Sequence, residues 1–447
     1  MSAALAAGSR VGEAADPGQT TQRETAMRWK QNPQAVLIAL LVIHVIAHID
    51  RNMLLGFSPQ ITKDLAISNA QYGFLAGAVW VLSFGFMAVF LGSLADRFSR
   101  TRVIAAGILI WSVCTAASGA AQDFGQMVAA RFFVASGEAA LVPAAVSLLI
   151  ELFQARRAGT AVGVFFMGIP LGLGLAFTLA GVLGSSLGWR GSFFALGAIG
   201  VVLGLPALLL KDDRGARADV ERGAPFAQQV RNVVGLMRGN ATVASTVVGF
   251  VLVHMAFVGI AFAQLWLVRE RGLDAAAMAQ KIGLLGIVFG ILGSLVGGVL
   301  SDRLARRLPG GHAGFVVLLI LLCGPLMVAY RFADAGSAMF YVGMCAGFFL
   351  PLATYGPSLA LIQGLTPDAM RSTVTGITML LINVFAIAIG NLAVGAVSDR
   401  MAAAGSGHAL TYVLLATDIL VIAAALFYAM AARGPRVAEA PRGVAAH

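Results

Sequence analysis

The sequence predicts an all-α integral membrane protein with twelve transmembrane helices in two six-helix halves. Hydrophobic residues make up 59% of the 447 residues and charged residues only 12%, whereas soluble domains carry about 25% charged residues. Apolar stretches long enough to cross a hydrocarbon core of about 30 Å recur along the chain. A single long polar interval, residues 211–240, leaves six of these stretches on either side.

The boundaries of the two halves follow from these stretches. The N-terminal bundle is predicted over residues 35–210, the linker over 211–240 and the C-terminal bundle over 241–432, with polar tails at 1–34 and 433–447. The first tail lacks the short apolar core of a cleavable signal, so we expect it to remain in the cytoplasm. The expected helices are 35–60, 70–94, 103–121, 125–152, 158–184, 192–210, 241–268, 276–300, 313–330, 337–365, 373–398 and 409–432.

Lysine and arginine residues predict the orientation, because cytoplasmic loops are enriched in them. If both termini face the cytoplasm, 22 of these residues lie on the cytoplasmic side and seven, including Arg331, lie on the opposite side. The basic residues are scattered through short loops, so the net charge of +10 does not indicate a nucleic-acid-binding surface. The three cysteines lie in apolar stretches and are expected to be packing residues rather than disulfide partners.

A six-helix unit occurs twice in the sequence. GSLADRFSR (92–100) follows the second helix and GVLSDRLAR (298–306) follows the eighth, at a constant shift of 206 residues that also relates His48 to His254. Such duplication is typical of transporters built from two parallel halves with a site between them. We expect the two loops to gate access through their repeated residues, which are Gly92, Asp96, Arg97 and Arg100 in the first loop and Gly298, Asp302, Arg303 and Arg306 in the second.

Four ionisable residues lie inside predicted spans of the first half. Asp50 and Arg51 lie in helix one, and Arg131 and Glu138 lie in helix four. A charge at the centre of a bilayer costs at least about 2.5–3.5 kcal/mol, so residues of this kind usually serve a function. Alternatively, helix one ends at Ala47 and its two charges extend toward water. The apolar continuation NMLLGF favours the buried placement.

The spacing of these residues predicts how they pair. Arg131 and Glu138 are seven residues apart, so they share a helix face but lie about 10 Å apart along the axis. We therefore expect pairs between the helices, Asp50 with Arg131 and Arg51 with Glu138. Arginine does not lose its proton in proteins. The two acids are thus expected to couple to protons, and the two arginines to serve as counter-ions or substrate anchors.

Three histidines and a tyrosine extend the candidate site. His44 and His48 share a helical stripe with Arg51 at spacings of four and three. They are interpreted either as packed, hydrogen-bonded histidines or as cavity-lining or proton-relay residues. A metal site would need a third ligand, and the sequence offers none nearby, so we expect neither a metal nor a cofactor. His254 and Tyr355 are the cavity-lining candidates of the second half.

The two halves are expected to differ in chemistry. When helices four and ten are aligned, Arg131 and Glu138 fall on uncharged residues, and Tyr355 is the only ionisable residue of the segment FFLPLATYGP in helix ten. One half would then supply charge and the other an apolar wall, which suits an amphipathic anion. Asp418 in helix twelve has no partner evident in the sequence, and we expect it to make a structural hydrogen bond.

The repeated motif G-x-L-[AS]-D-R-x-[AS]-R resembles the signature loop of the major facilitator superfamily, and the resemblance extends over the whole chain. Within that superfamily, HIDR in helix one, ARFFVASGEAALVPAAVSLL in helix four and GWRGSFF before helix six resemble bacterial members of the spinster family. That family includes exporters of lysophospholipids and sphingosine phosphate. Its Asp-Arg and Arg-x6-Glu motifs match Asp50 and Arg51, and Arg131 and Glu138. The organic anion:cation symporter family, which moves sugar acids and other carboxylates, shares all four residues.

The resemblance implies the major facilitator fold and a monomeric secondary transporter in a bacterial inner membrane. Such a protein works by alternating access, and we expect it to couple to protons and to move an organic anion, with a lysolipid-like substrate favoured. A symporter of sugar acids or other carboxylates and a drug-type exporter are the alternatives. Gly168 and Pro170 resemble a kink found in antiporters, although Ile169 separates them.

Two other classes of function are alternatives to transport. A membrane hydrolase could be built on His44, His48 and Asp50, but no helix offers further ligands or partners for it. A non-transporting receptor would share the same fold. We expect no enzyme activity, and because the chain has no phosphate-binding loop of the type G-x4-G-K-[ST], transport would draw its energy from an ion gradient.

Overall fold

The computed structural model describes residues 32–87, 100–139, 141–207, 226–367 and 370–434. Within these ranges, twelve helices are long and apolar enough to cross a membrane, which confirms the predicted number of spans. They are Pro33–Gly56, Asn69–Met87, Thr101–Ala120, Phe124–Leu152, Arg157–Leu183, Gly188–Leu205, Ala241–Arg269, Ala275–Ala305, Gly311–Ala329, Ala338–Gly364, Arg371–Ala403 and Ala409–Ala432.

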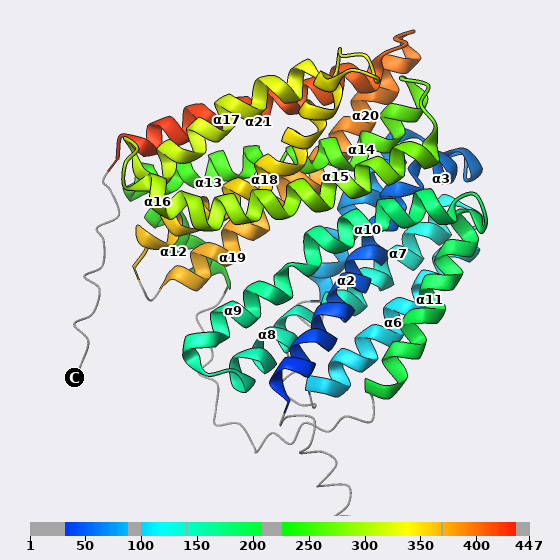
Figure 1. Cartoon of the computed structure of the whole chain (residues 1–447), viewed down its shortest axis with the longest axis horizontal. Coiled ribbons are helices and arrows are strands. Elements are labelled where there is room, and N and C mark those ends of the chain that lie inside the picture. Colours follow the sequence, from blue (N-terminus) through cyan, green and yellow to red (C-terminus); the bar gives the residue numbers. More distant parts are fainter. Residues whose placement is uncertain (1–31, 88–99, 140, 208–225, 368–369, 435–447) are drawn as a thin grey trace, which may run out of the picture.

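The spans form two helical bundles, one from each half of the chain (Figure 1). The first includes the α-helices α2 (Pro33–Gly56), α3 (Ser58–Asp64), α4 (Asn69–Gly73), α6 (Arg100–Ala120), α7 (Phe124–Ala139), α8 (Leu141–Leu152), α9 (Ala155–Phe166), α10 (Gly168–Leu183) and α11 (Gly188–Ala207). Those of the second are α13 (Ala241–Val253), α14 (Ala256–Arg269), α15 (Ala275–Leu295), α16 (Ser301–Ala305), α17 (Gly311–Ala329), α18 (Ala338–Gly364), α19 (Arg371–Leu381), α20 (Gly390–Ala403) and α21 (Ala409–Ala432).

Several spans are interrupted where the sequence removes or redirects a backbone hydrogen bond. The fifth span breaks between α9 and α10, and Pro170 accounts for the break because it cannot donate to the carbonyl of Phe166, the last residue of α9. The seventh span breaks at His254 and Met255, between α13 and α14. Short π-helical turns interrupt three other spans: η2 (Phe74–Ala78), η3 (Val296–Leu300) and η5 (Ile382–Ile389).

The predicted linker is partly helical. Residues 208–225 lie outside the described ranges, but α12 (Phe226–Gly239) occupies most of the remaining linker. It packs against α13 and α19, and Val233 on its apolar face is 2% exposed. Polar residues on the other faces of this amphipathic helix lower its mean hydropathy, so the sequence predicts a polar linker although one stripe of the helix is buried.

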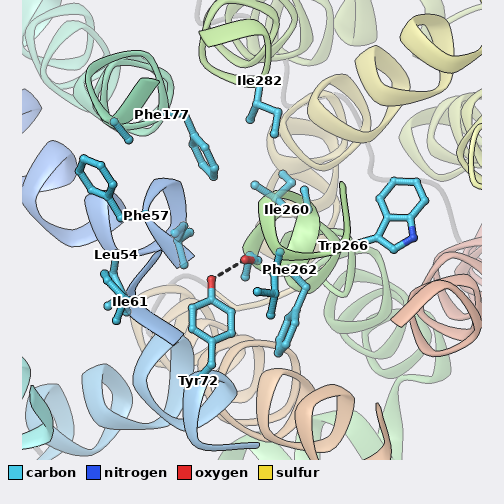
Figure 2. Packing of buried hydrophobic residues seen from close by; sticks show 14 of the residues in the cluster. Leu54, Phe57, Ile61, Tyr72, Phe177, Ile260, Phe262, Trp266 and Ile282 are labelled. Carbon is cyan, nitrogen blue, oxygen red and sulfur yellow. Dashed lines mark hydrogen bonds between the residues drawn. The ribbon is translucent and has the colours of Figure 1, made fainter. Parts of the chain in front are cut away.

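A cluster of buried apolar side chains lies where the two bundles meet. Phe57 and Phe177 come from the first half, and Ile260 and Ile282 come from the second. Figure 2 shows Tyr72 of α4 among these residues, with its hydroxyl donating a hydrogen bond of 2.6 Å to the backbone carbonyl of Ala261 in α14. The halves are therefore joined by both apolar packing and polar contacts.

The two ends of the molecule differ in how closely the halves approach. At one end, α4 packs on α20 and α10 packs on α15. The other end is where α2 begins and α21 ends. The bundles diverge toward α9 and α16 in Figure 1. Within the described ranges, the two bundles thus pack together at one end, called the closed end below, and diverge at the other, called the open end.

Candidate functional site

The first two charges of the candidate site form a buried ion pair between α2 and α7. The Nη1 atom of Arg131 lies 3.0 Å from Oδ1 of Asp50, and the side chains are 6% and 1% exposed. Helix α2 continues to Gly56, so the alternative in which it ends at Ala47 is wrong. The predicted pairing of Asp50 with Arg131 is confirmed.

Both partners have further hydrogen bonds. Thr115 of α6 donates its hydroxyl proton to Oδ2 of Asp50. Nη2 of Arg131 donates to the backbone carbonyls of Asp50, at 3.2 Å, and Arg51, at 3.0 Å. The carboxylate therefore has a donor on each oxygen, while the guanidinium also binds the backbone of α2. This second anchor means that Arg131 would keep two acceptors if Asp50 became neutral.

The second predicted pair, Arg51 with Glu138, does not form directly. Trp80 of the second span contacts both residues: the Cζ atom of Arg51 lies 3.8 Å from the Trp80 ring centroid, and the indole N–H donates to Oε2 of Glu138 at 3.4 Å. Within the described ranges, Arg51 makes no ion pair within 4.0 Å. The prediction of a direct pair is corrected, because the indole side chain lies against both partners.

Glu138 is only partly satisfied. Its Oε1 atom is buried and has no hydrogen-bond partner among the described residues. Its charge still interacts with those of Asp50, Arg51 and Arg131, so the four residues form one electrostatic cluster. Trp80, which stacks on Phe84 with ring centroids 4.8 Å apart, was not predicted. An aromatic residue in an apolar span carries no sequence signal that separates it from a packing residue.

His44 and His48 join α2 to the break in the fifth span. Nδ1 of His44 lies 2.9 Å from the backbone carbonyl of Phe165, and Nε2 of His44 lies 3.2 Å from Nε2 of His48. A carbonyl only accepts, so His44 carries its proton on Nδ1 and, when neutral, accepts at Nε2 from His48. Gly168 and Gly172 make room, because a Cβ on either would lie within 3 Å of these histidines.

His254 and Tyr355 lie together in the second half. His254 is 4% exposed and its Nδ1 lies 2.7 Å from the carbonyl of Phe250. Its ring centroid is 4.6 Å from that of Phe250 and 5.9 Å from that of Tyr355. Tyr355 is 38% exposed, and its hydroxyl contacts Sδ of Met379 at 3.4 Å. The second half thus offers an aromatic surface beside the break of the seventh span.

The repeated loops are described only in part. Gly92, Asp96 and Arg97 lie outside the described residues, and Arg100 begins α6. In the second loop, Gly298 belongs to η3, Asp302 and Arg303 to α16, and Arg306 follows α16 directly. All of these described positions lie toward the open end of the molecule. Their gating role remains a prediction.

Asp418 has a partner that the sequence did not indicate. Its Oδ2 atom lies 2.8 Å from Nε of Arg331, with side chains 1% and 2% exposed. The Arg331 guanidinium lies over the rings of Trp266 and Tyr330, 4.9 and 4.5 Å from their centroids. Arg331 lies in the turn that follows α17, which agrees with its predicted loop position, but its side chain is buried. The second half therefore contains a buried ion pair, which contradicts the expectation that it supplies only an apolar wall.

A small cavity adjoins this second pair. Its volume is about 20 Å³, and its lining includes Arg331, Asp418, Ile282 and Phe348. Nη1 of Arg331 is buried without a hydrogen-bond partner among the described residues. A space of this size holds about one water molecule.

The sequence model of the Major Facilitator Superfamily matches residues 40–391 of the chain. The chain is similar to an MFS-type efflux pump of Mycolicibacterium smegmatis, at 27% identity over 89% of this chain and 92% of the pump. It is similar to Protein spinster of Drosophila melanogaster, at 24% identity over 81% of this chain and 61% of that protein. It is also similar to the 3-(3-hydroxy-phenyl)propionate transporter of Escherichia coli, at 27% identity over 83% of this chain and 88% of that transporter.

A solved structure shares the fold. It is the crystal structure of a bacterial homolog of the human lysosomal transporter spinster, in an inward-facing and unoccupied conformation. The TM-score is 0.76 and the sequence identity 22%, over 90% of this chain and 97% of that one. These comparisons confirm the expected resemblance and the expected fold of two six-helix halves.

Proposed function

The chain belongs to the Major Facilitator Superfamily, and we propose that it is a proton-coupled secondary transporter of an amphipathic organic anion. It works by alternating access as a monomer in a bacterial inner membrane, with both termini in the cytoplasm. The observation that carries the proposal is the unequal pairing of the four central charges. Asp50 and Arg131 are paired, whereas Arg51 has no carboxylate within 4.0 Å among the described residues and Glu138 has one buried oxygen without a donor.

Arg51 is the proposed anchor of the substrate anion. Its guanidinium lies over the indole of Trp80, and stacking of this kind covers the face of the group while leaving its N–H edges available. Those edges match a carboxylate or phosphate in two places at once. An anion bound there would also supply the negative partner that Arg51 lacks in the described part of the chain.

Asp50 and Glu138 are the proposed proton carriers. A buried carboxylate oxygen without a donor is costly, and a proton on Glu138 would remove that cost. A proton on Asp50 would weaken its ion pair with Arg131, which joins α2 to α7. Because Arg131 keeps the carbonyls of Asp50 and Arg51 as acceptors, the ion pair can open while the guanidinium retains hydrogen bonds.

The second half favours an apolar portion in the substrate. Phe250, Phe257 and Tyr355 surround His254, and Tyr355 is exposed. A lysolipid has an anionic head and an apolar tail, and so satisfies both halves. The Escherichia coli relative is named for an aromatic carboxylate, which has the same two parts on a smaller scale. A sugar acid has no apolar part to place against these rings.

A binding panel tests the substrate class. Purified protein is heated with lysophospholipids, fatty acids, aromatic carboxylates, sugar acids and a neutral amphiphile, and the midpoint of unfolding is measured for each. The proposal predicts that amphipathic anions raise the midpoint for wild type and for Arg190→Lys, a control whose arginine pairs with Asp64 near the closed end. Arg51→Lys should lose most of the rise.

Two outcomes would overturn the assignment. Equal stabilisation by the neutral amphiphile would remove the need for an anion site. Equal stabilisation of wild type and Arg51→Lys by the same anions would remove Arg51 as the anchor. A ligand that passes the panel is then tested for uptake into proteoliposomes, which separates a transporter from a receptor.

A further inference from the structure

The closed end is held by a carboxylate that caps a helix of the opposite half. Asp399, near the end of α20, accepts hydrogen bonds from the backbone N–H groups of Asn69, at 3.0 Å, and Ala70, at 2.8 Å. These residues form the first turn of α4, which opens the second span. A negative charge at a helix N-terminus is favoured both by these unpaired N–H groups and by the helix dipole.

The same turn shows why a residue from the other half is needed. The first N–H groups of a helix have no partner within it. Ser68 and Gln71 satisfy each other through a capping box. The N–H groups of Asn69 and Ala70 are left, and both bind Asp399. Separating the halves at this end would therefore leave two N–H donors and one carboxylate without their hydrogen-bond partners.

Arg269 adds a second link at this end. It is the last residue of α14, and its guanidinium donates to Oδ1 of Asn69 at 2.9 Å and to the hydroxyl of Thr62 in α3 at 2.6 Å. The amide of Asn69 in turn donates to the hydroxyl of Ser398 at 3.1 Å. Asn69 is 8% exposed, so it lies buried between two helices of the second half.

Glycines bring the two backbones into contact beside this link. A Cβ on Gly73 would lie 2.2 Å from the carbonyl oxygen of Asn391, and one on Gly395 would lie 2.2 Å from that of Asn69. Such distances exclude any side chain. Figure 1 shows α20 and α3 at this end of the molecule, away from the diverging ends of α9 and α16.

The sequence around Asp399 repeats the motif of the two predicted gating loops. GAVSDR (395–400) matches GSLADR (92–97) and GVLSDR (298–303) in its glycine, its aspartate and its arginine. The third copy lies at the closed end, whereas the second lies toward the open end. At the closed end the partner of the aspartate is visible: it is the N-terminus of a helix in the other half.

We propose that Asp399 is a positioning residue of the transport cycle, whose carboxylate, with Arg269, latches one end of the transporter shut. The latch must break for this end to open, so it sets the balance between the two facing states. The proposal rests on alternating access, but neither on proton coupling nor on the substrate. Its test can therefore be run without either.

Distances across the closed end measure the latch. Spin labels are placed on Lys63→Cys and Ala403→Cys, two exposed positions in α3 and α20, in a background without the three native cysteines. Wild type should show one short distance. Asp399→Asn keeps the shape but loses the charge, and should raise the long-distance, open population about tenfold, the factor expected when one hydrogen bond to a charged group is lost.

Further variants make the result decisive. Arg269→Gln should shift the distances in the same direction by a smaller factor, and Asp399→Glu should restore most of the closed population. Asp334→Asn, a control in a loop of the second half, should leave the distribution unchanged. If Asp399→Asn does not fold, Arg269→Gln carries the test alone. A wild-type distance distribution in the folded latch variants would overturn the proposal, whatever the substrate proves to be.

Discussion

The described residues form two buried ion pairs, one in each half, and the pairs differ in what surrounds them. Asp50–Arg131 and Arg331–Asp418 have similar separations, 3.0 and 2.8 Å, and all four side chains are at most 6% exposed. The first pair lies beside two further ionisable residues. The second pair is covered by the rings of Trp266 and Tyr330.

Burial and pairing alone therefore do not identify a transport site. A buried pair can serve stability, specificity or function. The two pairs differ in the hydrogen-bond acceptors that would remain to each arginine if its carboxylate were removed. Arg131 also binds two backbone carbonyls, whereas the hydrogen bonds of the Arg331 guanidinium within the described ranges go only to Asp418. We therefore propose that the first pair opens during the transport cycle and that the second stays closed.

The largest expected effect is on transport, and it should be confined to the first half. Asp50→Asn and Glu138→Gln keep the side-chain shape but cannot carry a proton. We expect each to reduce gradient-driven uptake to the level of empty liposomes while leaving the protein folded. Asp418→Asn is the matched control and should retain uptake per folded molecule. Wild-type response of both acid variants to an imposed pH gradient would show that the protons bind elsewhere.

The next largest effect is on the free energy of unfolding, where Asp418→Asn should lose more than Asp50→Asn. Asp418→Asn leaves Arg331 buried without its partner, and removing one member of a buried pair costs about 3–5 kcal/mol. Asp50→Asn should cost about 1 kcal/mol, comparable to one net hydrogen bond, because Arg131 keeps its carbonyl acceptors. Denaturant unfolding of the detergent-solubilised variants measures both. Equal losses would erase the distinction between the two pairs.

The two arginines of the candidate site, Arg51 and Arg131, should also differ in the effects of their substitution. Lysine keeps the charge but loses the planar fork. Arg51→Lys should weaken substrate binding about tenfold, or about 1.4 kcal/mol, without changing proton binding. Arg131→Lys should change the pH dependence of uptake, with little effect on affinity at the optimum pH. Identical effects of the two variants on affinity and pH profile would contradict this division of roles.

The smallest expected effect concerns Trp80. Trp80→Phe keeps an aromatic face for Arg51 but removes the N–H that Glu138 accepts. Affinity in Trp80→Phe should fall by less than the roughly twofold to fivefold that the loss of a whole cation–π contact, worth about 0.5–1 kcal/mol, would cause. Trp80→Leu, which loses both contacts, should have the larger effect on titrated substrate binding. An unchanged affinity in Trp80→Leu would place the substrate away from Arg51.

The sequence predicted the fold and the first pair for physical reasons. Hydropathy and a constant repeat shift suffice for twelve spans in two halves. The seven-residue spacing of Arg131 and Glu138 ruled out an easy pair within the helix, and this directed Arg131 to Asp50. The same reasoning failed for Arg51 and Glu138, because spacing along a helix says nothing of a third side chain from another span.

Other features had no local signal. Arg331 and Asp418 lie 87 residues apart, and hydropathy placed Arg331 in a loop because it follows the last apolar residue of its span. The sequence shows that Asp399 follows an apolar stretch, but it does not indicate that the N-terminus of α4 is its partner. In each case the missing information was which helix lies next to which, and that depends on the packing of the whole bundle.

Proton movement evoked by the substrate tests the central claim most directly. Proteoliposomes with a pH-sensitive dye inside receive a substrate identified by the binding panel, with no imposed gradient. Wild type and Asp418→Asn, compared per folded molecule, should show a change of internal pH when the substrate is added, and the double variant Asp50→Asn with Glu138→Gln should show none. A wild-type signal in the double variant, or substrate uptake by wild type without any proton movement, would contradict coupling through the charges of the first half.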